Sequence, residues 1–390
     1  MAYAHRDIIY DADTHMMERP DWIAEFADPD IRPRLAPFLE GKEDVLPRVE
    51  DALEQFKARQ ADPAMAAEAA ERFMGWDHKG WHGLGSFDAA ERVRVNDLLG
   101  FSGHIVFPTT AFEQVCAAKE PEVFVGGVRA LNRGLDAFCG VDKRMYGAAY
   151  LPLGLGPDAS AELLDEIVAA GFSVVLVDTV APDGGKSFTH PDYDPIWSRL
   201  EGERIAVTLH VGANGGYTPV PASFYDNARE TPPPDEGDAP RDALGFMAIQ
   251  YNAELFLSAM IFDGVLEKFP KLKIGVVELS AEWMISWIKR LDMSWRSFRR
   301  RQDLSHLSMA PSDYVTRQIK ATPFPGEDIG WILRSGGEDL LMFASDYPHH
   351  EGTDDPIGRY ERTMDGVSEA AKQKFYCDNF RDLLGPRLSA

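Results

Sequence analysis

Short apolar runs alternate with amphipathic segments along most of the chain. Eight runs rich in valine, isoleucine and other aliphatic residues predict strands. Their near-continuous apolar character is typical of strands buried on both faces of a parallel sheet. The predicted strands are Ile8–Asp13, His104–Pro108, Tyr146–Leu151, Val174–Asp178, Ala206–Val211, Lys273–Glu278, Gln318–Thr322 and Leu340–Ser345.

The segments between these runs have the apolar spacing of helices. Ala159–Ala170 is followed by Gly171, a residue that often ends a helix, and Ala253–Phe269 and Ala281–Arg299 have the same kind of pattern. Eight alternations of strand and helix favour a closed (β/α)₈ barrel, the TIM barrel, over an open sheet. We therefore expect residues 1–390 to form a single α/β barrel domain.

Two stretches are too long to be simple connections. After the first strand, residues from about 40 to 90 include a charged helical segment, Pro47–Met74, which predicts an inserted lid or dimerisation element. After the fifth strand, residues from about 212 to 241 are rich in glycine, proline and acidic residues. Loops of that length in compact domains are usually functional, so we expect this one to close over a site.

The charge balance narrows the classes of partner. The chain has 63 Asp and Glu residues against 40 Lys and Arg, a formal net charge of −23. Such a surface repels phosphate backbones and anionic membranes, so we expect no nucleic-acid and no membrane partner. The sequence shows neither a signal-peptide pattern nor an uncharged apolar run of membrane-spanning length, and its three cysteines are too few for a disulfide framework. These features predict a cytoplasmic protein.

Candidate metal ligands stand at the ends of four predicted strands. In a (β/α)₈ barrel the active groups lie at the C-terminal ends of the strands. Asp13 and His15 follow the first strand, and residues i and i+2 of an extended chain share a face, so these two side chains can converge on one ion. His210, Glu278 and Asp346 end the fifth, sixth and eighth strands.

Each of these residues also has a simpler interpretation. His210 could be a hydrogen-bonded core histidine, Glu278 could cap the following helix, and Asp346 could begin a turn before Pro348. These explanations are independent of one another, whereas a bound divalent metal explains all the residues together. The sequence therefore predicts a metal site.

The same segments resemble a known family. The chain is similar to the amidohydrolase-related family that includes aminocarboxymuconate semialdehyde decarboxylase and resorcylate-type decarboxylases. The resemblance covers nearly the whole chain and is carried by Asp11–Glu18, His190–His210, Phe269–Asp292, Leu341–Gly352 and Asn379–Leu384. It implies an amidohydrolase-superfamily barrel in which Asp13 and His15 are the first-strand metal pair and His210 is the fifth-strand ligand. It also implies that Asp346 binds the metal and handles the proton of a metal-bound water.

The chain departs from the family pattern in its ligands. Many relatives have His-x-His on the first strand, where this chain has Asp13 and His15 with Glu18 nearby, and Glu278 stands where the decarboxylases have a catalytic histidine. Zinc is the expected ion, and iron or manganese, possible also as a dinuclear centre, is the alternative that a carboxylate-rich shell favours. His349 either acts on substrate or metal or orients Asp346. The segment 76–85 is either an apolar wall of the site or a packed loop.

The expected function is a metal-dependent hydrolase or non-oxidative decarboxylase. Its substrate would be a small, cyclic or aromatic-derived organic acid or amide, with Asp346, His349 and Glu18 as catalytic candidates. The first alternative is a non-haem iron or manganese oxygenase, for example one that hydroxylates an amine nitrogen. The second is a non-catalytic metal-binding subunit. We expect a homodimer or larger oligomer, with a hetero-oligomer containing a related chain as the alternative.

Overall fold

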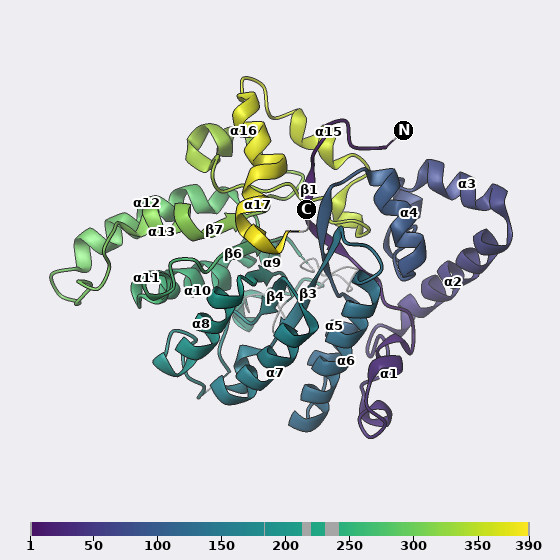
Figure 1. Ribbon diagram of the computed structural model, residues 1–390, viewed down its shortest axis with the longest axis horizontal. Coiled ribbons are helices and arrows are strands. Elements are labelled where there is room, and N and C mark those ends of the chain that lie inside the picture. Colours follow the sequence, from purple (N-terminus) through teal and green to yellow (C-terminus); the bar gives the residue numbers. More distant parts are fainter. Residues whose placement is uncertain (1, 183, 213–219, 231–241, 389–390) are drawn as a thin grey trace. The chain divides into compact units, whose positions relative to one another are not determined.

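Seven parallel strands follow one another in chain order in the computed structural model, which describes residues 2–182, 184–212, 220–230 and 242–388. Helices alternate with the strands (Figure 1), so the protein has a TIM-barrel-like α/β fold. The chain divides into two compact units. The first contains residues 2–150 and Ala344–Gly358, and the second contains the other described residues.

The first unit is built on a parallel sheet of three strands. These are β1 (Tyr10–His15), β2 (Gly103–Phe107) and β3 (Met145–Leu151, whose last residue belongs to the second unit), and all their residues are buried. Tyr10 lies opposite Gly103 and His15 opposite Phe107. Between Asp11 and Thr14 the register shifts because β1 has one residue more than β2. Such a bulge changes the direction of the side chains that follow it, and here it lies at the candidate ligands.

The helices of the first unit include the predicted insertion. They are α1 (Trp22–Phe26), α2 (Leu46–Ala61), α3 (Pro63–Arg72), α4 (Ala89–Leu99), α5 (Thr110–Cys116) and α6 (Pro121–Cys139). The single helical segment predicted over Pro47–Met74 is in fact the pair α2 and α3. The helices separate at Asp62, whose side chain accepts a hydrogen bond from the Ala64 N–H, and Pro63 then takes the first helical position, where no N–H is needed.

The second unit contains four parallel strands in chain order. They are β4 (Val174–Val177), β5 (Ala206–His210), β6 (Ile274–Val277) and β7 (Ile319–Ala321). Its helices are α7 (Pro157–Ala170), α8 (Asp194–Glu203), α9 (Ala243–Ala248), α10 (Tyr251–Phe262), α11 (Val265–Lys268), α12 (Glu282–Phe298), α13 (Pro311–Gln318), α14 (Ile329–Ile332), α16 (Glu369–Gln373) and α17 (Asn379–Leu384); α15 (Pro356–Glu361) crosses the boundary between the units. Figure 1 shows α12 and α13 side by side, and the two helices are in contact.

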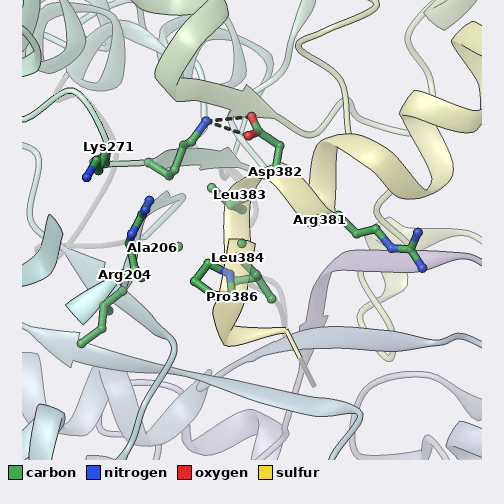
Figure 2. A pocket seen from close by; sticks show the side chains of 11 residues that line it. Arg204, Ala206, Lys271, Arg381, Asp382, Leu383, Leu384 and Pro386 are labelled. Atoms are coloured by element: carbon green, nitrogen blue, oxygen red, sulfur yellow. Dashed lines mark hydrogen bonds and ion pairs between the residues drawn. The ribbon is translucent and has the colours of Figure 1, made fainter. Parts of the chain in front are cut away.

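Glycines decide where two of these helices end. Helix α7 ends at Ala170, and Gly171 follows with a left-handed φ of 85°, as the sequence predicts. The helix predicted over Ala253–Phe269 is interrupted at Gly264, whose φ of 81° separates α10 from α11. Helix α17 packs close to β6, since a Cβ atom at Gly275 would lie 3.2 Å from the Leu383 side chain. Figure 2 shows Asp382, Leu383 and Leu384 on this helix.

The predicted eighth strand, Leu340–Ser345, does not form a regular strand. Leu341 makes an isolated bridge with Ala321, and Tyr347 makes another with Thr14. Between them, the Ser345 N–H donates to the Asp11 carboxylate instead of to a neighbouring strand. Asp346 has a left-handed φ of 54°. A backbone that bonds to a side chain and then turns left-handed cannot continue a ladder, so the prediction of a regular strand is wrong.

Two further segments concern sequence predictions. Of the predicted loop over about 212–241, the structure describes Gly212 and residues 220–230; the rest lies outside the described residues.

By length and composition alone, Ala243–Phe262 could cross a membrane. It is weak evidence for a span, because α10 buries Phe256, Leu257 and Met260 as a core helix does. Cys116, Cys139 and Cys377 form no disulfide within the described part of the chain.

Candidate metal centre

In the first unit, three candidate ligands meet at the end of β1. The Nε2 atom of His15 lies 3.2 Å from Oδ1 of Asp13 and 3.6 Å from Oδ1 of Asp346. All three residues are buried. The shared face predicted for Asp13 and His15 is therefore confirmed, and the segment after Leu341 brings Asp346 to the same point by donating its N–H to the Asp13 carbonyl.

A fourth side chain, His349, joins this cluster. Its ring stacks on the His15 ring with centroids 3.9 Å apart, and its Nδ1 lies 3.1 Å from Oδ1 of Asp346. The Thr109 hydroxyl lies 3.1 Å from Nε2 of His349 and 3.1 Å from Nδ1 of His15. Thr109 thus holds both imidazoles, and both nitrogens of His349 have neighbours within the protein. This geometry favours the interpretation that His349 orients Asp346.

Asp346 is a carboxylate in an unusual setting. Its backbone is left-handed, a conformation that costs free energy for a residue other than glycine. In the protein alone, burial raises the pKa of Asp346 to about 8, and His349 opposes this rise. Its Oδ2 atom is buried and accepts no hydrogen bond within the described part of the chain. A buried oxygen of this kind is what a cation would satisfy.

Glu18 lies outside the group of atoms that meet here. Its carboxylate accepts hydrogen bonds from the N–H groups of Thr109 and Ala111, at the first turn of α5. Burial raises the pKa of Glu18 to about 7, and these donors oppose the rise. A carboxylate at a helix N-terminus stabilises the helix. In this structure Glu18 therefore fixes the backbone of Thr109, which in turn contacts the two imidazoles.

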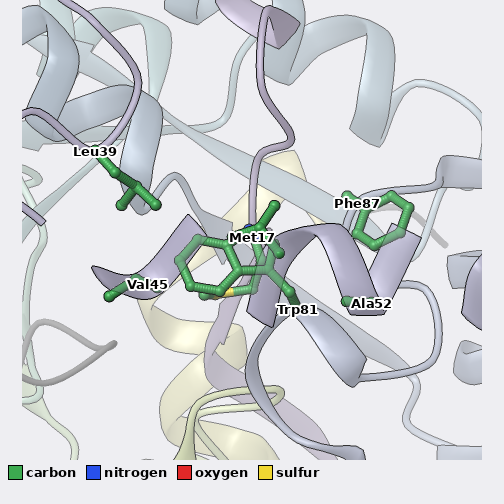
Figure 3. Close-up of a cluster of buried hydrophobic side chains, with 7 residues drawn as sticks. Met17, Leu39, Val45, Ala52, Trp81 and Phe87 are labelled. Carbon is green, nitrogen blue, oxygen red and sulfur yellow. The ribbon is translucent and has the colours of Figure 1, made fainter. Parts of the chain in front are cut away.

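The segment 76–85, with Ser86 and Phe87 after it, is a packed support for the cluster. Trp81 is buried, and its indole N–H donates to the Glu18 carbonyl, while the Ser86 carbonyl accepts from the Met17 N–H. Figure 3 shows Trp81 and Met17 at the centre of an apolar cluster, with Val45 on one side and Phe87 on the other. Of the two interpretations of this segment, the structure favours the packed one.

Two buried cations of the first unit lie beside Tyr347. Lys79 and Arg92 both approach its ring, at 5.3 Å and 5.5 Å from the centroid. Arg92 also donates to the His15 carbonyl, so it fixes the backbone at a candidate ligand. Burial lowers the pKa of Lys79 to about 8, and it also lowers the pKa of Arg92.

In the second unit, His210 and Glu278 form a second pair of candidate ligands. They end β5 and follow β6, both are buried, and Nε2 of His210 lies 3.6 Å from Oε2 of Glu278. Nδ1 of His210 lies 2.8 Å from the Val211 carbonyl and must donate to it, because a carbonyl oxygen can only accept. This hydrogen bond fixes the orientation of the ring whose Nε2 faces Glu278.

Glu278 does not cap the next helix. The N–H groups of Ala281 and Glu282, at the start of α12, donate to the Glu327 carboxylate. Glu278 instead has a left-handed φ of 54°, the same value as Asp346, and its N–H donates to the Thr322 hydroxyl. Non-glycine residues in this conformation are concentrated at functional sites.

The donor set fits a divalent metal ion. In the first unit, one ligand atom from each of His15, Asp346 and His349 lies within 4.8 Å of the others. All three residues are buried. They therefore differ from exposed acidic groups, which are common in proteins that bind no ion there. Imidazole nitrogen with carboxylate oxygen suits zinc, manganese or iron.

Sequence reasoning missed two residues that organise this cluster. Thr109 follows β2 directly after Pro108, so the rule that located the other candidates, polar residues at strand ends, could have found it. Asp11 lies inside β1 and accepts hydrogen bonds from the N–H groups of Asp13 and Ser345. Burial raises the pKa of Asp11 to about 8. Nothing in its sequence position separates it from a residue of the buried strand.

The chain matches a family model. Residues 112–385 match the model described as amidohydrolase, which covers well over half of the chain. Among proteins with curated descriptions, none matches.

Solved structures share the fold. An amidohydrolase from Mycobacterium avium subsp. paratuberculosis is 23% identical with a TM-score of 0.71, over 98% of this chain and 100% of that one. The 2,6-dihydroxybenzoate decarboxylase from Rhizobium is 22% identical with a TM-score of 0.57, over 75% and 87% of the two chains. A dihydroxybenzoic acid decarboxylase from Polaromonas, solved with bound manganese and 2-nitroresorcinol, is 18% identical with a TM-score of 0.62, over 97% of each chain.

Proposed function

Because the chain belongs to the amidohydrolase family, we propose that it is a metal-dependent hydrolase or non-oxidative decarboxylase of a small aromatic or cyclic organic acid. The observation that carries the proposal is the buried cluster of Asp13, His15 and Asp346, with an Asp346 oxygen that accepts no hydrogen bond within the described chain. The substrate class is taken from the named activities of the similar decarboxylases.

We propose that Asp13, His15, His210, Glu278 and Asp346 hold one divalent ion. The support is that Asp13, His15, His210 and Glu278 stand at the C-terminal ends of β1, β5 and β6, where (β/α)₈ enzymes assemble their sites, and that Asp346 lies beside His15. A divalent ion there supplies a Lewis acid and lowers the pKa of a coordinated water. The sequence alone favoured zinc, but the manganese in similar decarboxylases does not support that expectation, so manganese is the first ion to test.

The protein's own groups supply proton transfer and orientation. Asp346 accepts or returns a proton at its carboxylate, and His349 and Thr109 hold that carboxylate and the His15 ring in place. The catalytic roles expected for His349 and Glu18 become positioning roles in this account, because Thr109 connects both residues to the ligands.

Which of these reactions the protein catalyses depends on Glu278. Where the similar decarboxylases are expected to have a histidine, this chain has a carboxylate that lies beside His210. The oxygenase alternative has no support among the similar proteins, whose named activities are decarboxylation and those of amidohydrolases.

An activity screen separates the two remaining reactions. Protein loaded with manganese, and separately with zinc, is incubated with 2,6-dihydroxybenzoate, with 5-carboxyvanillate and with the corresponding amides, and released CO₂ and free acid are both measured. Release of CO₂ that the Asp346→Asn variant lacks identifies a decarboxylase, and release of acid from an amide identifies a hydrolase. If the wild type and the variant are equally inactive on every compound with either ion, the proposed substrate class is wrong.

A further inference from the structure

A basic hollow lies in the second unit, at the opposite end of β5 from His210. It has a volume of about 150 Å³, roughly five water molecules, and it is lined by the start of β5, the residues before β6 and the end of α17. His210 ends β5 and Ala206 begins it, so the hollow and the His210 backbone are about 13 Å apart at roughly 3.3 Å per residue.

The residues that line the hollow have a net positive charge, whereas the whole protein has a net negative charge. Acidic residues outnumber basic ones by 63 to 40 in the chain, yet four of the lining residues are basic and one is acidic. The acidic one, Asp382, is already neutralised: Nζ of Lys273 lies 2.8 Å and 2.9 Å from its two oxygens, and Nζ of Lys320 lies 3.1 Å from one of them. The positive charge of the other lining residues is therefore not cancelled by Asp382.

Two of those residues, Arg204 and Lys271, form no ion pair within the described part of the chain. Figure 2 shows both on one side of the hollow, with Leu384 and Pro386 of the chain's last segment facing them. The apolar part of the lining includes Leu383, Leu384 and Pro386, of which Pro386 is exposed. Cations opposite an apolar wall suit a small anion that has an apolar body.

The backbone of Arg204 is a second, independent observation. Arg204 follows the last residue of α8 with φ 58° and ψ 37°, a left-handed conformation. At the corresponding position after α7 the chain has Gly171, for which this conformation carries no steric cost. The chain thus keeps a guanidinium where glycine would be more stable, and that side chain lines the hollow.

We propose that this basic hollow is an anion-binding site for a small oxyanion, either a carboxylate with an apolar body or a phosphate. Arg204 and Lys271 bind the oxyanion, and the end of α17 contacts the rest of the ligand. Such an anion joins the chain's last helix to the turn that begins β5, so its binding raises the thermal stability of the protein.

The test is a calorimetric titration of the full-length protein at low ionic strength, with inorganic phosphate in one arm and benzoate in the other. The variants are Arg204→Gly and Lys271→Gln, with Lys289→Gln as the matched control, because Lys289 is an exposed lysine on α12 away from the hollow. Arg204→Gly removes the cation and also suits the left-handed backbone. Its melting temperature without ligand should therefore not fall, which separates a lost site from a lost fold.

The proposal predicts that one of the two anions binds the wild type, and that Arg204→Gly and Lys271→Gln each weaken it by about ten-fold, the loss of one charge-assisted hydrogen bond. Lys289→Gln should bind as the wild type does. Binding of benzoate alone identifies the ligand as an organic carboxylate, and binding of phosphate alone identifies it as a phosphate. The proposal is overturned if neither anion binds, or if the doubly substituted protein, Arg204→Gly with Lys271→Gln, binds as tightly as the wild type.

Discussion

At the scale of single residues, two carboxylates have the same departure from ordinary backbone geometry. Asp346 and Glu278 both have a φ of 54°; Glu278 follows β6, and Asp346 follows the buried, irregular segment Leu340–Ser345. For either residue, an extended backbone would cost less conformational free energy than the left-handed one. The strain is consistent with selection for the direction in which the carboxylate points and not for stability.

The Asp346→Asn variant separates catalysis from folding. Asparagine keeps the shape of the side chain and tolerates left-handed backbone, so the fold should persist. Turnover should fall by about 10³-fold or more, because the group that accepts the proton is gone. The measurements are kcat on the substrate found in the activity screen and the melting temperature of both proteins. Wild-type turnover in this variant would refute the role given to Asp346.

The buried His104 predicts a specific pH dependence of stability. Burial lowers its pKa from 6.5 to about 3, so the folded state binds fewer protons than the unfolded state between these values. The neutral form of His104 therefore leaves the free energy of unfolding unreduced above pH 6.5. As the pH falls below 6.5, the unfolded state gains a proton that the folded state does not, and the free energy of unfolding decreases. Between pH 7 and pH 4.5 the histidine should contribute a loss of about 2.5 kcal/mol in the free energy of unfolding.

A His104→Gln variant tests this contribution by denaturant unfolding at both pH values. Glutamine cannot gain the proton, so the difference between the two pH values should shrink by that amount. An unchanged difference would show that His104 is not the group responsible, whatever the absolute stability of the variant.

Contacts between side chains could be predicted from the sequence where they follow from the geometry of a single strand. Asp13 and His15 share a face because they are two residues apart on a strand, and they do meet. The contacts of Thr109 could not be predicted, because they depend on His349, which lies 240 residues away in the chain. The contacts of Glu18 could not be predicted for the same reason: its partners are backbone N–H groups at the start of α5.

At the scale of elements, the seven regular strands lie within about two residues of their predicted bounds, because an unbroken apolar run marks a strand buried on both faces. The eighth run is equally apolar but does not form a ladder. The feature that interrupts it is a side chain of another strand, Asp11, which takes the Ser345 N–H. Hydrophobic periodicity contains no information about such a bond.

The segment between α3 and α4 provides a matched pair of tryptophans for testing its role. Trp81 is 1% exposed and lies in the apolar cluster, whereas Trp76 is 51% exposed. Trp81→Ala should lower the free energy of unfolding by about 3–5 kcal/mol, and Trp76→Ala should change it by less than about 1 kcal/mol. Denaturant unfolding measures both. Equal effects would mean that the segment does not support the end of β1.

At the scale of the whole molecule, the family is the best-supported conclusion, since one family model matches residues 112–385. The single barrel domain, the oligomer and the roles of the inserted segment remain predictions. The alternative of a non-catalytic subunit also remains a prediction. Turnover by the isolated chain would exclude it. Specificity cannot be predicted from the sequence, because it resides in loops, and much of the longest one lies outside the described residues.

The most direct test of the central claim is the metal content of protein purified without chelator, measured by elemental analysis for the wild type and for His210→Ala. His210 belongs to one unit and Asp13, His15 and Asp346 belong to the other, so the variant asks whether both contribute to one centre. We expect about one divalent ion per wild-type chain and a clear loss of that ion in the variant. A wild type without metal, or a variant that retains its full content, would contradict it.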